Sequence, residues 1–115
     1  MPSPPLVPDD GPIDIAHLQR MTLGEENLER DVLAMFSAQA AGLVQALAGL
    51  PSDAATLVHT LKGSARAIGA FAVADAAGAL EVLIRSGGDR TSAMAELDDA
   101  VKQARAAIDD ILQRS

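Results

Sequence analysis

The sequence predicts an all-α fold, an antiparallel up-down-up-down four-helix bundle with a short additional helix at its N-terminal end. Hydrophobic residues make up 49% of the 115 residues, yet only two residues are aromatic, so the apolar content is mostly Ala, Leu, Val, Ile and Met. Ala and Leu are strong helix formers. No segment alternates apolar and polar residues as a half-buried strand would. A chain of this length forms one domain with a single core.

The prolines divide the chain into a tail and a folded domain. Residues 1–12 hold five of the six prolines and show no periodicity, so this segment is predicted to be a disordered tail. Residues 13–115 are predicted to form the helical bundle. Its expected elements are a short helix from about Ile13 to Thr22 and longer helices over residues 26–49, 53–68, 71–86 and 91–113.

Breaks and apolar spacing define each of these helices. Gly24, Pro51, Gly69 and the Gly87-Gly88 pair separate them, and Ser52 or Asp53 can cap the helix that follows. Apolar residues recur near every 3.6 positions and are predicted to face inward. In the two helices before Gly69 they are Leu28, Val32, Met35 or Phe36, Ala40, Leu43, Leu47 and Leu50, then Ala54, Val58, Leu61, Ala65 and Ile68. In the two helices after it they are Val73, Ala76 or Ala77, Leu80, Leu83 or Ile84, then Met94, Leu97, Val101, Ala104, Ile108 and Ile111 or Leu112.

Charge and composition exclude several classes of function. The net charge is −7, from 16 acidic and 9 basic residues, so the domain lacks the attraction that nucleic acids or anionic membranes require. Without cysteine it forms no disulfide and no thiolate metal site. We recognise no signal peptide and no apolar run near the roughly 20 residues of a membrane span. The sequence therefore predicts a cytoplasmic, monomeric protein that binds neither nucleic acid nor a membrane.

The predicted helix 53–68 carries an unusual group of residues on its outer face. At about 100° per residue, the inward stripe is centred near Leu61. His59 then lies about 140° from that centre, Gly63 about 180°, Arg66 about 120° and Lys62 about 80°. His59 and Lys62 are three residues apart, close enough to share a ligand. The pattern predicts an exposed histidine flanked by cations.

This group suits a phosphoryl carrier. Neutral imidazole is a good nucleophile near pH 7, and Lys62 or Arg66 can offset the negative charge that a phosphorylated His59 gains. A glycine within a helix costs roughly 0.5–1 kcal/mol relative to alanine, and the bundle does not require one at the exposed Gly63. We interpret Gly63 as room for a partner that approaches His59.

The same helix carries a run that resembles the signature of histidine-containing phosphotransfer (HPt) domains: His59-Thr60-Leu61-Lys62-Gly63-Ser64-Ala65, followed by Gly69. The similarity covers residues 13 to 113. It implies a four-helix bundle whose His59 exchanges a phosphoryl group with an aspartate of a response-regulator receiver domain. It also implies that Lys62 interacts with that group, that Gly63 leaves room for the receiver, and that Ser64 lies in the binding motif.

Two positions on the next helix also bear on the resemblance. Arg85 resembles a basic position near the histidine in some HPt members. Glu81 stands where some members carry a glutamine that bonds near the imidazole, and this departure puts an assisting role for Glu81 in doubt. An i,i+4 salt bridge between Glu81 and Arg85 is the interpretation favoured by their spacing. We also expect an apolar part of the docking surface around Ile15 or Leu18.

The resemblance implies a relay intermediate without kinase activity. The chain has no Gly-rich phosphate loop, so it is expected to need no cofactor, and Mg²⁺ is expected only on the partner receiver. The expected partners are receiver domains and an upstream sensor histidine kinase, with the chain acting as a free-standing carrier. The alternative is a non-catalytic adaptor that docks on receivers. A metal-binding bundle is disfavoured, because His59 points outward and His17 has no Glu-x-x-His partner.

Overall fold

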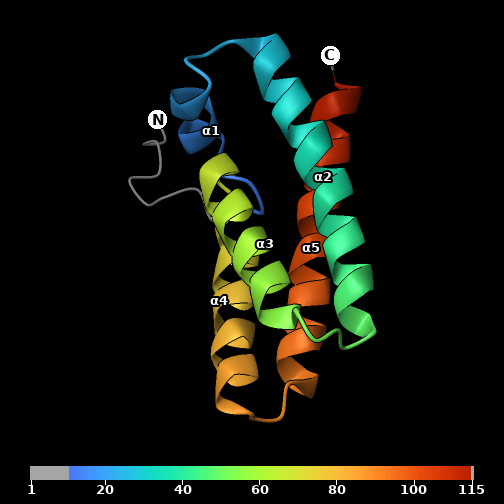
Figure 1. Ribbon diagram of the computed structural model, residues 1–115. Helices are drawn as coiled ribbons and strands as arrows, with labels where there is room; N and C mark the ends of the chain where they lie inside the picture. Colours follow the sequence, from blue (N-terminus) through green and yellow to red (C-terminus); the bar gives the residue numbers. More distant parts are fainter. Residues whose placement is uncertain (1–10, 115) are drawn as a thin grey trace, which may run out of the picture.

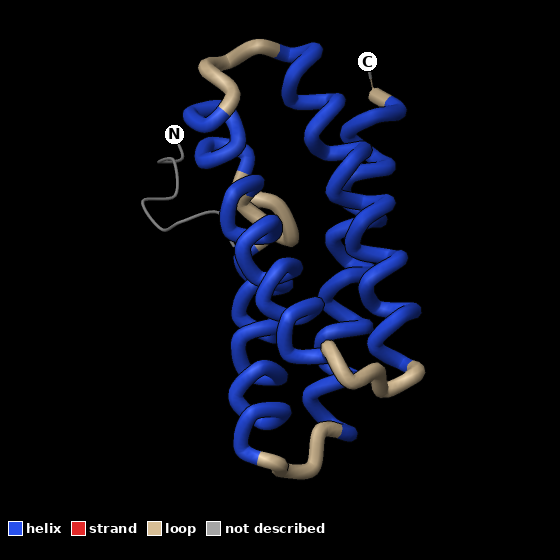
Figure 2. The backbone as a smooth tube through the Cα atoms, viewed as in Figure 1, coloured by secondary structure: helices blue, strands red, loops and turns tan. Residues whose placement is uncertain are grey.

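The computed structural model describes residues 11–114, which form five helices and no strand (Figure 1, Figure 2). The helices are α1 (Ile15–Met21), α2 (Glu26–Ala48), α3 (Ala54–Ile68), α4 (Phe71–Ser86) and α5 (Thr91–Gln113). Figure 1 shows the four long helices running alternately up and down, with α1 beside the end of α3. The predicted all-α bundle with a short additional helix is confirmed. The tail predicted for residues 1–12 lies outside the described residues, except for its last two positions.

The predicted helix boundaries agree with the observed ones to within one or two residues. The short helix begins at Ile15 rather than Ile13, because Asp14 is its N-cap and accepts a hydrogen bond from the backbone N–H of His17 at 3.0 Å. Of the two predicted caps, Ser52 and Asp53, it is Asp53 that occupies the N-cap position of α3, and its side chain makes no capping hydrogen bond.

The core contains the inward residues predicted for α3 and most of those predicted for α4 and α5. The prediction for α2 needs correction. Its buried stripe runs through Leu33, Phe36, Ala40 and Leu47, as expected for residues spaced three, four and seven apart. Leu28 is 42% exposed because it lies five residues before Leu33, off that stripe, and Leu50 is exposed because α2 ends at Ala48. Of the two alternatives at positions 35 and 36, Met35 is 71% exposed and Phe36 is buried.

A two-residue connection joins α3 to α4 and makes them an antiparallel helical hairpin. Gly69 ends α3 in the left-handed region, with φ +88°, and the N–H of Ala70 donates to the carbonyl of Ala65 at 2.8 Å. The chain before α1 packs directly on this turn, since the N–H of Asp14 donates to the carbonyl of Gly69 at 2.8 Å. A Cβ at Gly69 would lie only 2.8 Å from the Asp14 carbonyl oxygen. Glycine at position 69 therefore serves two purposes: it adopts the left-handed conformation of the turn, and it allows the backbone of Asp14 to approach closely.

Helix α2 is unusually poor in charge. No charged residue occurs between Asp31 and Asp53, and an 18-residue window of α2 reaches a mean hydropathy of 1.3. By length and composition this helix could span a membrane, which differs from the prediction that no segment comes close. The core helix of a soluble bundle meets the same criterion, and α2 packs here against α3 and α5.

Candidate functional site

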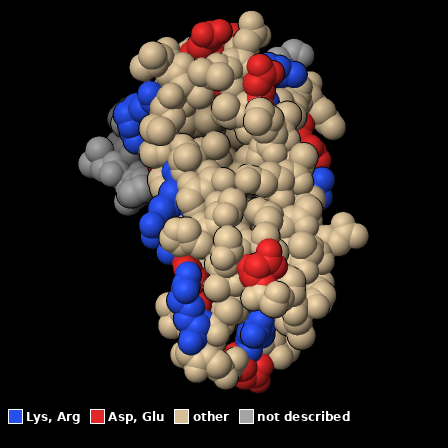
Figure 3. All heavy atoms as spheres, in the orientation of Figure 1, with Lys and Arg blue, Asp and Glu red and all other residues tan. Residues whose placement is uncertain are grey.

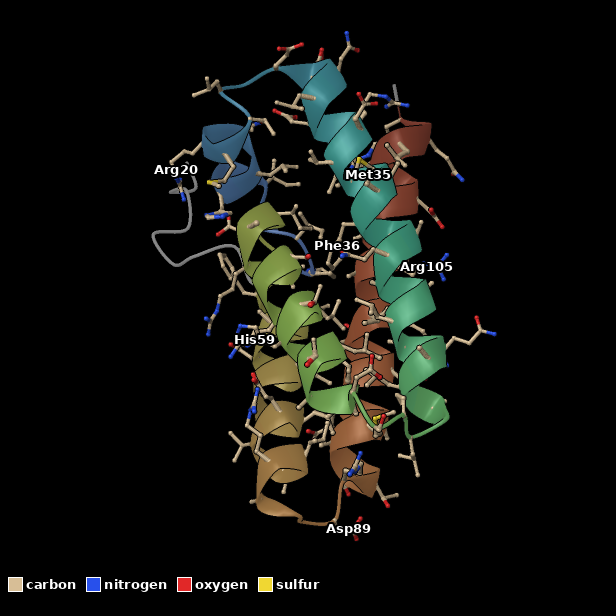
Figure 4. All side chains as sticks on the ribbon, in the orientation of Figure 1. Arg20, Met35, Phe36, His59, Asp89 and Arg105 are labelled. Atoms are coloured by element: carbon tan, nitrogen blue, oxygen red, sulfur yellow. The ribbon has the colours of Figure 1, made fainter. Side chains whose placement is uncertain are left out.

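The candidate site lies on the outer edge of the α3–α4 hairpin. Figure 4 shows His59 on the side of α3 that faces away from Phe36 and the bundle interior. The imidazole is 65% exposed, and Lys62 lies one turn further along α3 with its side chain largely covered. From α4, Glu81 and Arg85 reach the same place. The predicted exposure of His59 and the flanking position of Lys62 are thus seen in the structure.

The carboxylate of Glu81 joins these side chains into one cluster. Its Oε1 accepts a hydrogen bond from Nζ of Lys62 at 2.9 Å. Its Oε2 accepts from Nη2 and Nε of Arg85 at 2.9 and 3.2 Å, and lies 3.2 Å from Nδ1 of His59. Glu81 is itself buried, and burial of a charged carboxylate is unfavourable. The hydrogen bonds from these partners offset that cost of desolvation.

Hydrogen bonds from Lys62 and then Arg85 lower the pKa of Glu81 from its ordinary value of 4.5 to about 2, against the opposing effect of burial. The carboxylate is therefore ionised throughout the physiological range and can only accept hydrogen bonds. The facing nitrogen of His59, Nδ1, must then carry the proton. Among residues 11–114 the other ring nitrogen, Nε2, has no hydrogen-bond partner, so its lone pair is available toward solvent.

The lowered pKa of Glu81 predicts a pH dependence of stability. A carboxyl group whose pKa is lower in the folded than in the unfolded chain stabilises the fold above pH 4.5 and loses that contribution as the pH falls toward 2. Replacing Glu81 with Gln removes this titration. Urea unfolding at a series of pH values should show a shallower loss of stability for Glu81→Gln than for the wild type between pH 4.5 and 2. Equal slopes for the two proteins would contradict this prediction.

The remaining predicted site residues are distributed around the cluster. Gly63 is exposed, and a Cβ added to it would meet no atom within 4 Å, so packing within the bundle does not require glycine there. Arg66 is exposed and has no ion-pair partner within residues 11–114. Ser64 lies on the side of α3 that faces α2, away from His59, and lines a groove between these helices.

This groove provides an exposed apolar surface close to the site. It has a volume of about 420 Å³ and is lined by Val32, Met35, Phe36, Gln39, Ser64, Ala67 and Ile68. Of the two residues around which an apolar docking surface is predicted, Leu18 is buried against the core, whereas Ile15 is half-buried. Figure 3 shows a broad face without charge over α2 and α3, with basic side chains along the edge formed by α1, α3 and α4.

Sequence reasoning predicted the Glu81–Arg85 pair but missed the other contacts of Glu81. The i,i+4 salt bridge is present, with Oε2 and Nη2 2.9 Å apart. The same carboxylate also reaches both His59 and Lys62. Spacing within one helix could not show this, because the contact depends on the register between α3 and α4. One feature of the sequence does point to the contact between Glu81 and His59: Glu81 stands where some members of the family that the sequence resembles carry a glutamine that bonds near the imidazole.

The second histidine has a structural role. Nε2 of His17 lies 3.2 Å from the carbonyl oxygen of Ala67, and its ring meets Phe71 edge-on with centroids 5.1 Å apart. These contacts hold α1 against the α3–α4 turn. Within residues 11–114 no three His, Asp or Glu side chains group in a way that could hold a metal ion.

Comparison with known proteins identifies one family. A family model described as Hpt domain matches residues 31–114, which is most of the chain and includes α3, α4 and α5 completely. Searches of curated proteins and of solved structures find no significant match.

Proposed function

The chain belongs to the Hpt domain family, the histidine phosphotransfer modules of two-component systems, and we propose that His59 is its phosphoacceptor. The observation that carries this proposal is the orientation of the imidazole. Its Nδ1 is held by the Glu81 carboxylate at 3.2 Å, while the free Nε2 lies on an exposed ring. A neutral imidazole held in one tautomer is a ready nucleophile near neutral pH.

The surrounding cations suit phosphoryl transfer, which depends chiefly on positioning and charge stabilisation. In the proposed reaction, Nε2 of His59 and a carboxylate oxygen of a receiver aspartate exchange the phosphoryl group. Lys62 can turn from Glu81 toward that group, and Arg66 and Arg85 add positive charge at the same edge. Any Mg²⁺ is proposed to be bound by the receiver, with no cofactor on this chain.

The exposed surface around His59 supports docking of a receiver domain. Gly63, one turn after His59, leaves open space, and the apolar groove lies on the adjacent side of α3. Hpt domains interact with response-regulator receivers in phosphorelays. We further propose that a sensor histidine kinase acts upstream, and that the protein is a cytoplasmic monomer.

A phosphotransfer assay tests this function. The protein is incubated with a receiver domain that carries labelled phosphate, and transfer of the label to the chain is followed with time. The product should be acid-labile and base-stable, as expected for phosphohistidine, and mass spectrometry should locate the phosphate on His59. A chain that binds the receiver but gains no label would instead be the non-catalytic adaptor.

The open space beside Gly63 predicts that a large side chain there blocks docking without damaging the fold. Gly63→Gln should weaken receiver binding at least tenfold, because the new side chain occupies the surface one turn from His59. Its thermal stability should not fall, since Gln is favoured over Gly in a helix by roughly 0.5–1 kcal/mol. Isothermal titration calorimetry with the receiver and thermal unfolding measure the two effects.

Gly42→Gln is a matched control, because Gly42 is also an exposed helical glycine whose added Cβ would meet nothing within 4 Å. This variant should bind the receiver as the wild type does. Equal losses of affinity in the two variants would assign the effect to the altered helices and contradict a docking role for Gly63.

A further inference from the structure

We propose that Gly78 is a positioning residue for phosphoryl transfer at His59. Because Gly78 has no side chain, the aliphatic stem of Lys62 can lie across α4 and hold the Lys62 ammonium group at the site. The inference rests on the proposed function of His59 and names the residue of the neighbouring helix on which the position of Lys62 depends. Gly78 acts through Lys62 and takes no part in the bond changes.

Gly78 differs from the other glycines within helices that the structure describes. Gly42 and Gly63 face open space, since a Cβ added to either would meet no atom within 4 Å. A Cβ added to Gly78, in the middle of α4, would lie 3.5 Å from Cδ of Lys62. The φ of Gly78 is not positive, so its backbone suits any residue, and glycine within a helix is less favourable than alanine. Position 78 therefore needs a small residue because of Lys62 and not because of the backbone.

The two lysines of the chain differ in how far they are covered. Both form ion pairs at 2.9 Å, Lys62 with Glu81 and Lys102 with Asp98. The Lys102 side chain is nevertheless 74% exposed, whereas the Lys62 side chain is only 22% exposed. Ion pairing alone therefore does not cover a lysine in this protein. Lys62 is covered because its stem packs on α4 beside Gly78 while its charged end reaches Glu81.

A stem that is held as far as Cδ leaves the ammonium group only short movements. Lysine is among the side chains that lose most conformational entropy when they are ordered. With Cδ of Lys62 against α4, only the two bonds nearest the ammonium group remain free to turn. Nζ of Lys62 and Nδ1 of His59 contact the same carboxylate, at 2.9 and 3.2 Å, so the cation is held beside the imidazole. The entropy of ordering Lys62 is thus lost on folding and not again during transfer.

The held cation acts on the charge that transfer brings to His59. As the lone pair of Nε2 bonds to phosphorus, the bond from phosphorus to the receiver's carboxylate oxygen breaks, and its electron pair stays with that oxygen. The phosphoryl oxygens then carry their negative charge to the His59 ring. A cation that is already in place stabilises this charge without reorganisation, whereas a lysine displaced into solvent would have to be ordered again.

Nuclear Overhauser NMR of the wild type tests the position of the stem directly. The α protons of Gly78 and the δ protons of Lys62 should give a cross-peak, because the effect is seen only between protons in close proximity. This measurement requires neither a substitution nor a receiver. Absence of the cross-peak would overturn the proposal.

Substitution of Gly78 tests its effect on transfer. In Gly78→Ile, carbon atoms fill both γ positions that a helix favours, so the Lys62 stem must move away from α4. The maximal rate of transfer from a phosphorylated receiver should fall roughly tenfold, because a displacement of about 1 Å can cost up to about 100-fold. The receiver concentration that gives half this rate should stay within about twofold. An unchanged maximal rate, or a change in that concentration alone, would contradict the proposal.

Gly78→Ala keeps the stem in ordinary contact at 3.5 Å and should transfer within about twofold of the wild-type rate. The double variant Lys62→Ala/Gly78→Ile distinguishes positioning from a general effect on the fold. If Gly78 acts through Lys62, the isoleucine substitution can slow transfer only while Lys62 is present. The double variant should therefore transfer at the rate of Lys62→Ala alone. Effects of the two substitutions that multiply would overturn the proposal.

Gly42→Ile is the matched control, because it makes the same change at a helical glycine that faces open space. It should transfer at the wild-type rate, and circular dichroism should show the same helix content in all variants. If Gly78→Ile does not fold, the wild-type cross-peak still decides on the contact with Lys62. Full labelling of the wild type and an equal rate in Gly78→Ile would refute only the role of Gly78. A wild type that gains no phosphate on His59 would refute the proposed function itself.

Discussion

His59→Gln is expected to abolish uptake of phosphate from a phosphorylated receiver. Glutamine has a comparable polar side chain whose amide N–H can still donate to Glu81, but its amide nitrogen has no lone pair that can attack phosphorus. Because His59 is 65% exposed, the substitution should leave the core and the thermal stability unchanged. The initial rate of labelling should fall by at least about 1,000-fold, to the background of the assay, because the variant lacks the nucleophile.

His17→Gln provides the control for this experiment, since His17 and His59 are the two histidines of the chain. His17 faces the carbonyl of Ala67 and the ring of Phe71, away from the cluster, so its loss should leave labelling intact. Full labelling of His59→Gln, or loss of labelling in His17→Gln alone, would show that His59 is not the phosphoacceptor.

Leu61→Ala is expected to produce the largest loss of stability that we predict. Leu61 lies between His59 and Lys62 in sequence, but its side chain faces the core, where it is fully buried. Truncating a buried leucine removes apolar contacts and leaves a cavity, which typically costs about 2–5 kcal/mol. For a small domain with a total stability of about 5–15 kcal/mol this is a large fraction. Urea unfolding monitored by circular dichroism measures the change.

Leu28→Ala is the matched control. It also distinguishes the orientation of α2 in the structure from the orientation that the sequence predicts. The sequence predicted that Leu28 faces inward, whereas the structure has it 42% exposed. The substitution should therefore cost less than about 1 kcal/mol. A cost for Leu28→Ala equal to that for Leu61→Ala would support the stripe predicted from sequence over the observed one.

The orientation of α3 was predictable because its two faces differ strongly in character. Val58, Leu61 and Ala65 recur at helical spacing, and residues between them are polar or small, so the periodicity has one interpretation. In α2 the apolar residues are distributed over almost the whole circumference of the helix. Adjacent residues such as Met35 and Phe36 are then equally plausible in the core, and only packing against α3 and α5 decides between them.

The candidate site was predictable in part for a similar reason. His59, Lys62 and Gly63 share one helix, so their relative directions follow from helix geometry. Glu81 comes from another helix, and its contact with His59 depends on the register of α3 and α4, that is, on their relative position along the helix axes. That register is set by the turn at Gly69 and by the packing of α3 against α4, in which the small residues Ala65 and Ala77 are both fully buried. No pattern within a single helix contains this information.

The two-residue turn between α3 and α4 has a consequence for the order of folding. His59 and Lys62 lie only 22 and 19 residues from Glu81, and Arg85 is one turn further along the same helix. Closing so short a loop costs little chain entropy, and contacts between near neighbours in sequence form early. The contact of α1 with this hairpin spans about 50 residues and depends on the Asp14–Gly69 hydrogen bond. Local opening of α1, as hydrogen exchange would detect it, can therefore leave the histidine and its partners in place.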